Sequence, residues 1–268
     1  MGLRKSLRAA INRPLRPLGL SVERLNGGPS CVYDGDGLRI LRRNLSFMSD
    51  PKFQAAYSRG MASGHKVSAG RVSRQKDPSA DIGVQFRAYI ECWAASQGLG
   101  KPGDFVFCGV NTGIFPLTVC DFLDINATDK TVWLFDTYAG VPKSQMAGAE
   151  IRHSAMYDEY YFDCYDLAAK NFSQFPRAKL VKGTVPETLT SVEIGKVAYL
   201  SIDMNIAYPE RKALEFFWPK LAAGALVIFD DYAFFGHEQQ RDAIDEFARS
   251  AGVSVLTLPT GQGMLMRP

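Results

Sequence analysis

The sequence lacks any apolar run long enough to cross a membrane. Its longest apolar stretches, residues 105–110 and 225–229, have only the length of a strand. The first residues do not contain the apolar segment of a signal peptide. Cysteine is also sparse: the five cysteines form no CxxC pair, and three of them lie in apolar runs, which is typical of buried thiols in a reducing compartment. These absences predict a cytoplasmic protein.

A large excess of charge of one sign is absent as well. The 31 basic and 28 acidic residues leave a net charge of +3, which is too small to indicate a nucleic-acid partner. Positive charge does gather in residues 1–25, where Leu3, Leu7 and Ile11 are spaced four apart and predict a short basic amphipathic helix. We expect residues 1–30 to form an N-terminal arm that is either solvated or in weak contact with an anionic membrane surface.

The three-glycine fingerprint of dinucleotide-binding proteins is missing, although a related unit is present. The apolar run 105–110 is followed by a turn with Gly109 and Gly113 and then by an apolar segment suited to a helix. Such a unit brings backbone N–H groups close to a ligand. A second strand-like run, 131–136, ends in Asp136, where nucleotide-binding α/β proteins place a carboxylate on the ribose. Two glycines favour a mononucleoside-like cofactor and disfavour an NAD(P) oxidoreductase, and a purely structural turn is the alternative.

Strand-like and helix-like segments alternate from residue 105 onward. This pattern predicts an α/β domain over residues 101–268, with a mostly parallel sheet and helices on both faces. The expected strands are 105–110, 131–136, 178–182, 197–202, 225–229 and 253–258, and the expected helices lie near 114–123, 158–173, 209–221 and 238–251.

Residues 31–100 are expected to form a helical cap or lid ahead of that domain. Apolar spacing predicts helices at 52–61 and 84–97. The loop 64–76 between them is basic, and its charges would suit an anionic substrate such as a nucleotide sugar. A solvated loop is the alternative.

Three carboxylates are expected at one edge of the sheet. Asp203 follows the strand 197–202, and Asp230 and Asp231 follow the strand 225–229, so the carboxyl ends of neighbouring parallel strands present them together. Two carboxylates about 4 Å apart repel by roughly 4 kcal/mol at an effective dielectric constant near 20, and a cation relieves this repulsion. Ligation by oxygen alone favours Mg²⁺ over zinc. In the alternative, one aspartate caps the following helix and another faces solvent.

A metal ion at this edge would acidify a substrate hydroxyl, and Asp203 or His237 could then accept the proton. His237 lies just after the acid pair in the sequence. The alternative is that His237 caps the next helix or faces solvent.

Five sequence motifs, taken together in their order along the chain, are more specific for a protein family than any one of them. They are PGDFVFCGVNTG at 102–113, FDTYAGVP at 135–142, IDMNIAYPE at 202–210, FDDY at 229–232 and LPTGQG at 258–263. Together they resemble the macrocin O-methyltransferase family of S-adenosylmethionine-dependent class I methyltransferases, and the resemblance covers about residues 50–268.

The resemblance implies a Rossmann-like methyltransferase fold, S-adenosylmethionine as methyl donor, Mg²⁺ held by Asp203, Asp230 and Asp231, and a sugar or other small hydroxylated metabolite as acceptor. It assigns the turn at 109–113 to the methionine part of the donor and Asp136 to its ribose. The full set of residues implied for the donor is Arg87, Gly109, Val110, Asn111, Thr112, Gly113, Asp136, Thr137, Tyr138, Gly183, Thr184 and Asp203, with Tyr138 by the adenosine and Gly183 and Thr184 flanking the adenine.

One position departs from the family pattern. Cys108 stands before the turn where the family usually has an acid that contacts the cofactor. This departure supports the alternative of a catalytically silent binding or scaffold protein with the same fold. The three acids favour the enzyme, because a silent protein has no need of a repulsive cluster.

The aromatic residues at 216–218 and 234–235 form either core or an exposed surface, and the second case would suit a homo-oligomer.

Overall fold

The computed structural model describes residues 31–41, 43–66 and 81–268. These described residues belong to two units, one containing residues 31–34 and 39–44 and the other residues 35–38 and 45–268, apart from the gaps just given. Strands β1 (Cys31–Gly35) and β2 (Leu38–Leu41) pair as a two-stranded sheet. The expected amphipathic helix with its membrane contact and most of the basic loop lie outside the described residues.

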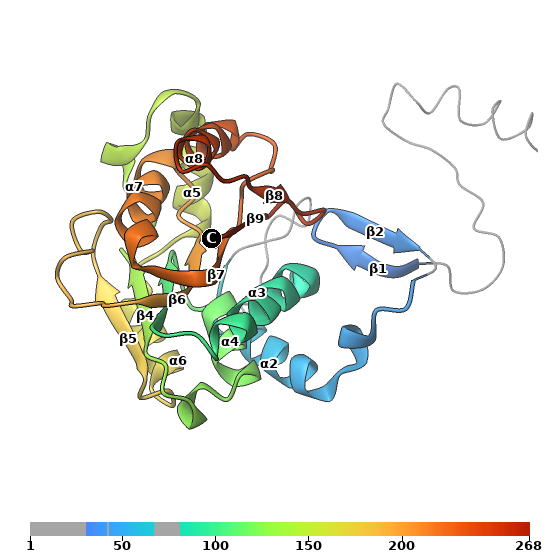
Figure 1. Cartoon of the computed structure of the whole chain (residues 1–268). Helices are drawn as coiled ribbons and strands as arrows, with labels where there is room; N and C mark the ends of the chain where they lie inside the picture. Colours follow the sequence, from blue (N-terminus) through green and yellow to red (C-terminus); the bar gives the residue numbers. More distant parts are fainter. Residues whose placement is uncertain (1–30, 42, 67–80) are drawn as a thin grey trace, which may run out of the picture. The chain divides into compact units, whose positions relative to one another are not determined.

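The larger unit is built on a seven-stranded sheet with the order β5-β4-β3-β6-β7-β9-β8 (Figure 1). The first five of these strands run parallel, and β9 pairs antiparallel with both β7 and β8. Because β3 lies between β4 and β6, the strand order reverses there, and α/β proteins bind ligands at such a switch point. The strands are β3 (Asp104–Cys108), β4 (Val132–Asp136), β5 (Ala178–Lys182), β6 (Val197–Ile202), β7 (Leu221–Phe229), β8 (Leu256–Thr257) and β9 (Gly263–Met266).

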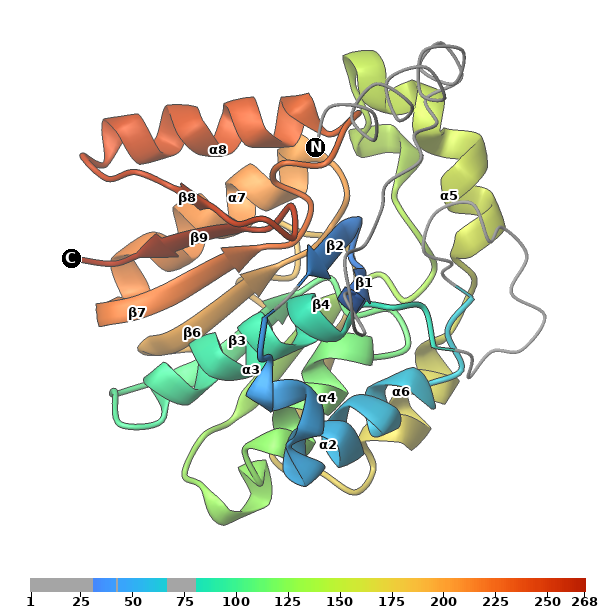
Figure 2. The same cartoon turned by 90° about the vertical axis from the view of Figure 1, so that its right-hand side faces the viewer.

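Helices cover both faces of this sheet. Figure 2 shows α7 and α8 on one side and α2, α3, α4 and α6 on the other. The helices are α2 (Pro51–Met61), α3 (Gln85–Gly98), α4 (Ile114–Phe122), α5 (Ser154–Tyr160), α6 (Tyr165–Phe172), α7 (Ala207–Phe217) and α8 (Glu238–Ser250), and the 3-10 helices are η2 (Ser46–Ser49), η3 (Ile125–Ala127), η4 (Lys143–Gln145), η5 (Gly148–His153) and η6 (Trp218–Lys220).

The alternation of side chains along β3 explains the two cores. Phe105 and Phe107 pack in the core on the side of α3 and α4, whereas Val106 and Cys108 pack in the core on the side of α7 and α8. A strand buried on both faces needs a continuously apolar sequence, which is what the run 105–110 provides. The fold confirms the predicted α/β class, and the strands expected at 178–182 and 197–202 match β5 and β6 to the residue.

Two predicted elements are wrong. The helix expected over 158–173 is broken into α5 and α6, because Tyr161 is extended and the backbone N–H of Cys164 donates to Tyr138 O at 2.8 Å. The strand expected at 253–258 shrinks to β8, and the strand beside β7 is β9, which had no sequence signal of its own. The division of the chain at residues 30 and 100 stays a prediction.

Buried thiols are confirmed for the cysteines whose side chains are described. Cys92, Cys108, Cys120 and Cys164 are buried and free. No helix among the described residues is long and apolar enough to span a membrane.

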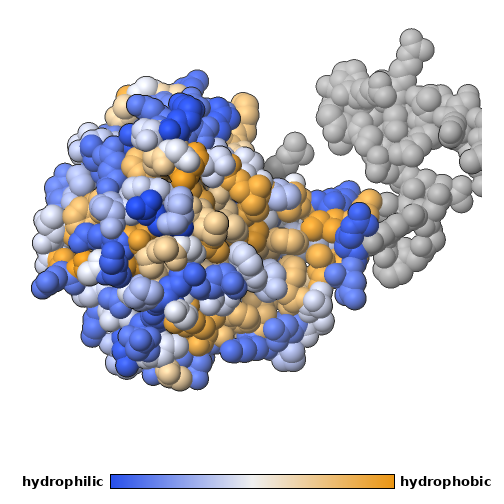
Figure 3. Space-filling view, in the orientation of Figure 1, coloured by the Kyte–Doolittle hydropathy of each residue, from blue (hydrophilic) through white to orange (hydrophobic). Residues whose placement is uncertain are grey.

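The aromatic residues divide between core and surface. Phe217 is fully buried, whereas Phe235 is 99% exposed. Figure 3 shows apolar residues on the face over α3. Among the exposed large apolar side chains are Trp93 of α3, Leu256 of β8 and Met266 of β9. A homo-oligomer stays a prediction.

Candidate active site

The carboxyl ends of five strands are joined by four hydrogen bonds that continue one residue beyond the strands. Gly109 N donates to Phe135 O at 2.9 Å, and Gly183 N donates to Asp136 O at 2.9 Å. On the other side of β3, Asp203 N donates to Cys108 O at 2.7 Å, and Asp230 N donates to Ile202 O at 3.0 Å. The segments after β3, β4, β5, β6 and β7 therefore form one continuous edge, as the sequence predicted.

Gly109 allows two of these segments to touch. Its φ angle is +95°, and a Cβ atom built on it would lie 1.8 Å from the backbone oxygen of Asp203. Only glycine fits, because the position requires both a left-handed backbone and the absence of a side chain. The turn then leads through Gly113, at φ +110°, into the first residue of α4.

Asp136 fixes the conformation of two turns. Its Oδ2 accepts from Val110 N at 2.6 Å and from Asn111 N at 2.7 Å, and its Oδ1 accepts from Tyr138 N at 2.6 Å. The hydroxyl of Thr137 lies 3.3 Å from Oδ1 but donates to Gly140 O at 2.6 Å. Sequence reasoning assigned Asp136 to a ribose, and this clamp on the glycine turn is an additional role that it did not predict.

Two residues implied for the donor direct their side chains into the protein interior. Thr112 Oγ1 lies 2.9 Å from Ser63 Oγ, and the hydroxyl of Tyr138 donates to Leu134 O at 2.9 Å. Both residues are buried, with exposed fractions of 0% and 1%. Their backbone atoms lie at the strand edge, so a contribution to a ligand would come from the main chain and not from the side chains.

The three acids come together at this edge. Burial, followed by repulsion from Asp230 and Asp231, raises the pKa of Asp203 well above its usual range. Burial also raises the pKa of Asp230 to about 6, although the charge of Arg87 lowers it. The side chains of Asp230 and Asp231 are 4% and 13% exposed, and neither α7 nor α8 has a side-chain cap, so the alternative of a capping and a solvent-facing aspartate is wrong.

Carboxylate oxygens are the ligands that Mg²⁺ prefers, so the donor chemistry of the three acids fits this ion. Within the described residues, however, no group of three or more His, Cys, Asp or Glu side chains is arranged to hold a metal ion. Asp230 has both oxygens engaged, since Oδ1 accepts from Gln262 Nε2 at 3.1 Å and Oδ2 accepts from Arg87 Nη1 at 2.5 Å. The structure gathers the acids without a formed cation site, and Mg²⁺ stays a prediction.

Arg87, which the resemblance implied for the methyl donor, binds two carboxylates, and its contact with the donor stays a prediction. Its Nη1 pairs with Asp230, and its Nε donates to Asp36 Oδ1 at 3.0 Å. Burial lowers the pKa of Arg87, but the charges of Asp230 and Asp36 together raise it by more, so the guanidinium stays charged. Sequence reasoning missed Asp36, because no motif or spacing connects it with the acids that follow the strands.

Glu91 is a second acid that the sequence did not identify as part of the site. It is fully buried on α3, where the hydroxyl of Tyr199 donates to its Oε2 and Ser201 Oγ lies 3.2 Å from its Oε1. Burial raises its pKa to about 8, although the hydrogen bond from Tyr199 lowers it. A lone acid on the apolar side of the predicted helix 84–97 is the signal that could have identified it.

Glu91→Gln is expected to become more stable than the parent protein as pH rises. The pKa of Glu91 is 4.5 in the unfolded chain and about 8 in the folded protein. The stability that the protonated carboxyl contributes to the folded state is therefore complete below pH 4.5 and is lost as the pH rises through about 8. Glutamine has no such proton, and its amide can still bond Tyr199 and Ser201. Urea denaturation should favour the variant by about 1 kcal/mol or more at about pH 9 relative to pH 5.

The exposed Glu193→Gln is the matched control and should show no such pH-dependent gain. If the parent protein and Glu91→Gln show the same pH dependence, Glu91 is ionised in the folded state and the expectation is wrong.

His237 lies at the first position before α8, but its side chain does not cap the helix. Its Nδ1 is 2.5 Å from Gln240 Oε1 and 3.8 Å from Asp231 Oδ2, and the side chain is 13% exposed. Both alternatives, a cap and a solvent-facing residue, are therefore wrong. Because Gln240 donates through Nε2 to Glu210, the amide oxygen of Gln240 is the atom that faces Nδ1 of His237. The role of His237 as a proton acceptor stays a prediction.

The segment between β4 and α6 is anchored beside the acids. The hydroxyl of Tyr157 donates to Asn205 O at 3.0 Å, and that of Tyr161 lies 3.3 Å from Asn205 Oδ1. Burial and then the charges of Asp203 and Asp231 raise the pKa of Tyr161. The segment containing η5 and α5 thus contacts the residues that follow Asp203, and it forms one wall of the site.

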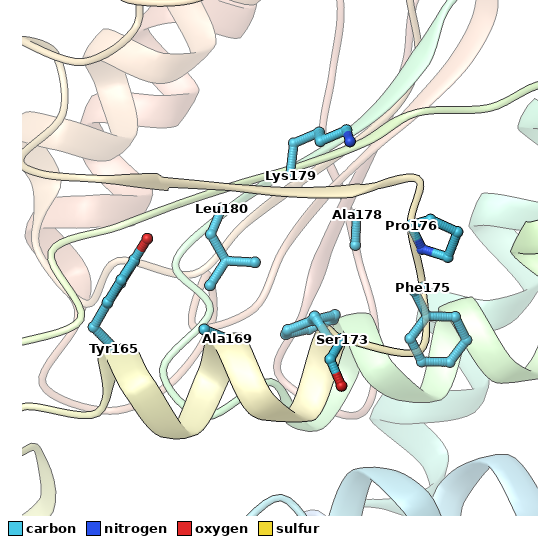
Figure 4. A pocket seen from close by; sticks show the side chains of 9 residues that line it. Tyr165, Ala169, Ser173, Phe175, Pro176, Ala178, Lys179 and Leu180 are labelled. Carbon is cyan, nitrogen blue, oxygen red and sulfur yellow. The ribbon is translucent and has the colours of Figure 1, made fainter.

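A separate hollow of about 350 Å³ lies between α6 and the edge strand β5. Figure 4 shows Ala178 and Leu180 directed from the strand toward α6, where Tyr165 and Ser173 lie, while Lys179 points the other way. None of the residues predicted for the site lines this hollow. The chemistry indicated by the sequence is therefore not located there.

Comparison with known proteins gives a family match. The model of the family described as Macrocin-O-methyltransferase (TylF) matches residues 85–257. This range contains every residue proposed for the site from the sequence, and the match confirms the resemblance drawn from the five motifs.

Two curated relatives are similar to part of the chain. The 8-demethyl-8-(2,3-dimethoxy-alpha-L-rhamnosyl)-tetracenomycin-C 4'-O-methyltransferase of Streptomyces olivaceus is 27% identical over 164 residues, which cover 58% of this chain and 61% of that protein. Mycinamicin III 3''-O-methyltransferase of Micromonospora griseorubida is 26% identical over 168 residues, covering 58% and 64%. The chain thus spans about three fifths of the length of these relatives.

Among solved structures, that of the O-methyltransferase NovP is similar to this chain with a TM-score of 0.67 and 20% sequence identity. The likeness covers 80% of this chain and 97% of that chain. It shows the fold alone, and it confirms the predicted Rossmann-like methyltransferase fold.

Proposed function

The chain belongs to the Macrocin-O-methyltransferase (TylF) family, and from this we propose that it transfers a methyl group from S-adenosylmethionine to a hydroxyl of a sugar or another small metabolite. The observation that carries the proposal is the contact between Gly109 and the backbone of Asp203. A turn suited to a nucleoside cofactor and a buried carboxylate suited to a hydroxyl therefore meet at one point.

The turn at 109–113 and Asp136 would bind the donor. The turn is ordered before a ligand arrives, because Asp136 already accepts three backbone N–H groups, and such preorganisation reduces the entropy lost on binding. A carboxylate offers about four acceptor positions, so roughly one remains for a ribose hydroxyl. We therefore expect Asp136 to bond one of the two ribose hydroxyls while it continues to hold the turn.

In the proposed reaction the acceptor oxygen attacks the methyl carbon in line with the carbon–sulfur bond. A carbon–oxygen bond forms as the carbon–sulfur bond breaks, the sulfonium becomes a neutral thioether, and the hydroxyl proton passes to Asp203. The raised pKa of Asp203, caused by burial and by the neighbouring acids, suits it to hold that proton. Most of the acceleration comes from alignment of donor and acceptor.

Mg²⁺ is part of the proposal, with Asp203, Asp230 and Asp231 as its ligands. When bound, it would lower the pKa of the acceptor hydroxyl. The support is electrostatic: the repulsion that raises the pKa of Asp203 is the repulsion that a divalent cation relieves.

A sugar acceptor is supported by one of the relatives, whose name describes a rhamnosyl-bearing substrate. The wall formed by η5 and α5 beside Asp203 is the part of the site best placed to contact such an acceptor. A nucleotide sugar stays a prediction, since most of the basic loop that suggested it lies outside the described residues.

Calorimetric titration with S-adenosylmethionine tests the proposal. We expect binding in the micromolar range by the parent protein, and a loss of about 100-fold or more in Asp136→Asn, because an amide cannot accept from both turns at once. The matched control is Asp104→Asn, since Asp104 likewise bonds backbone and side-chain N–H groups but lies at the opposite end of β3.

Asp104→Asn should retain donor affinity even where its melting temperature falls. Equal affinity in Asp136→Asn and the parent protein would remove Asp136 from the donor site. The absence of binding by the parent protein itself would favour the silent scaffold over the methyltransferase.

A further inference from the structure

Arg87 occupies the position between two buried acids. Its side chain is 16% exposed, while those of Asp36 and Asp230 are 0% and 4% exposed. The guanidinium carbon also lies 5.6 Å from the ring centre of Phe115 and 5.3 Å from that of Phe234. A buried guanidinium with two carboxylates and two aromatic faces is held in a defined place.

Asp36 and Asp230 hold Arg87 in different ways. Asp36 accepts from the backbone N–H groups of Phe86 at 3.0 Å and Arg87 at 3.3 Å, and its Oδ1 accepts from Arg87 Nε at 3.0 Å. It therefore anchors both the start of α3 and the base of the guanidinium. Asp230 bonds only the far nitrogen, Nη1, at 2.5 Å. The bond to Asp230 can break while the bonds to Asp36 remain.

The Oδ2 atom of Asp230 that Arg87 occupies is one of the oxygens that a cation between the three acids would need. Gln262 holds the other oxygen of the same carboxylate. A guanidinium and a divalent cation carry charge of the same sign, so both cannot lie against one carboxylate oxygen without strong repulsion.

We propose that Arg87 is a built-in counter-ion of Asp230 that a divalent cation displaces on binding, and that Asp36 retains the displaced guanidinium. The inference rests on the cation site of the proposed function. It gives Asp36 and Arg87 a role that no sequence motif assigned to them: they set the affinity of the acid cluster for its cation. We call the protein with Arg87 on Asp230 the closed form. Only molecules outside this form bind the cation, so the apparent cation affinity is the intrinsic affinity multiplied by the fraction of molecules that are not closed.

Binding of Mn²⁺, followed by the electron paramagnetic resonance signal of the free ion, tests this without any catalytic turnover. The first variant, Arg87→Met, should bind Mn²⁺ at least tenfold more tightly than the parent protein. Loss of a positive charge would strengthen cation binding even without displacement. This variant alone therefore does not separate displacement of Arg87 from the effect of the changed net charge.

The charge-conserving variant Asp36→Asn/Arg87→Met separates them. It has the net charge of the parent protein and leaves Asp230 Oδ2 free, while the amide oxygen introduced at position 36 can still accept from the start of α3. Displacement predicts Mn²⁺ binding at least tenfold tighter than in the parent protein, whereas a purely long-range charge effect predicts no change. Neutral replacement of both members of a buried pair is also better tolerated than removal of one.

The matched control is Asp34→Asn/Arg39→Met, which removes an exposed ion pair with side chains 60% and 67% exposed. It should bind Mn²⁺ like the parent protein, and an S-adenosylhomocysteine titration of each variant reports on the donor site separately from the cation site. Equal Mn²⁺ affinity in the parent protein and in Asp36→Asn/Arg87→Met overturns displacement but leaves the cation site intact. No Mn²⁺ binding by either protein overturns both the displacement and the cation site.

Discussion

Gly109→Ala is expected to lower the free energy of unfolding by more than about 4 kcal/mol, which is enough to unfold many domains of this size. The new Cβ atom would lie 1.8 Å from Asp203 O and 2.4 Å from Asp203 C, both of which are backbone atoms. Neither can move without breaking the bonds that join β3 to β6 at this edge. The φ angle of +95° adds backbone strain of roughly 1–2 kcal/mol for a residue with a side chain.

Gly252→Ala measures the backbone strain of a positive φ angle without any steric clash. Gly252 has a φ angle of +69°, but a Cβ atom there would meet nothing within 4 Å. We expect a loss of about 1 kcal/mol in urea denaturation, which is the cost of the left-handed backbone alone. If Gly109→Ala unfolds at the same urea concentration as Gly252→Ala, the close approach between Gly109 and Asp203 does not exist in solution.

Asp203→Asn is expected to reduce kcat/KM for methyl transfer by about 1,000-fold or more, because the group that accepts the acceptor proton is lost; general-base catalysis contributes about 10²–10⁴-fold. The substitution keeps the shape of the side chain and removes one charge from a repulsive cluster, so the folded state should persist. The measurement is transfer of an isotope-labelled methyl group to a panel of sugar acceptors.

The pH profile distinguishes this chemical role from a structural one. In the parent protein, the rate should rise with pH as Asp203 loses its proton. Burial and the charges of Asp230 and Asp231 raise its pKa, so without added Mg²⁺ the rise should lie above the usual aspartate range, and added Mg²⁺ should move it to lower pH. Asp203→Asn should lack this rise, whereas Asp104→Asn should keep it. An unaltered profile in Asp203→Asn would assign the proton to another group, with His237 the next to be tested.

The position of the site could be predicted from the sequence because it depends on local patterns. The apolar runs that became β3, β6 and β7 need burial on both faces, and their order along the chain implies parallel pairing. Once the strands are parallel, Gly109, Asp203 and Asp230 must lie at one edge, since each follows the carboxyl end of its strand. The motifs added the family, and the family match confirmed it.

The hydrogen bonds within the site could not be predicted, because they join residues that no local pattern connects. Arg87 and Asp230 are 143 residues apart, and Arg87 and Asp36 are 51 apart. Their pairing depends on where α3 and the turn at 35–38 pack, which side-chain volumes across the whole core decide. Strand β9 could not be predicted either, because its pairing with β7 is also long-range and its own sequence shows no strand periodicity. Local patterns were thus sufficient for the fold class and for the acids that face the site, whereas the arginine that holds one of those acids is a product of long-range packing.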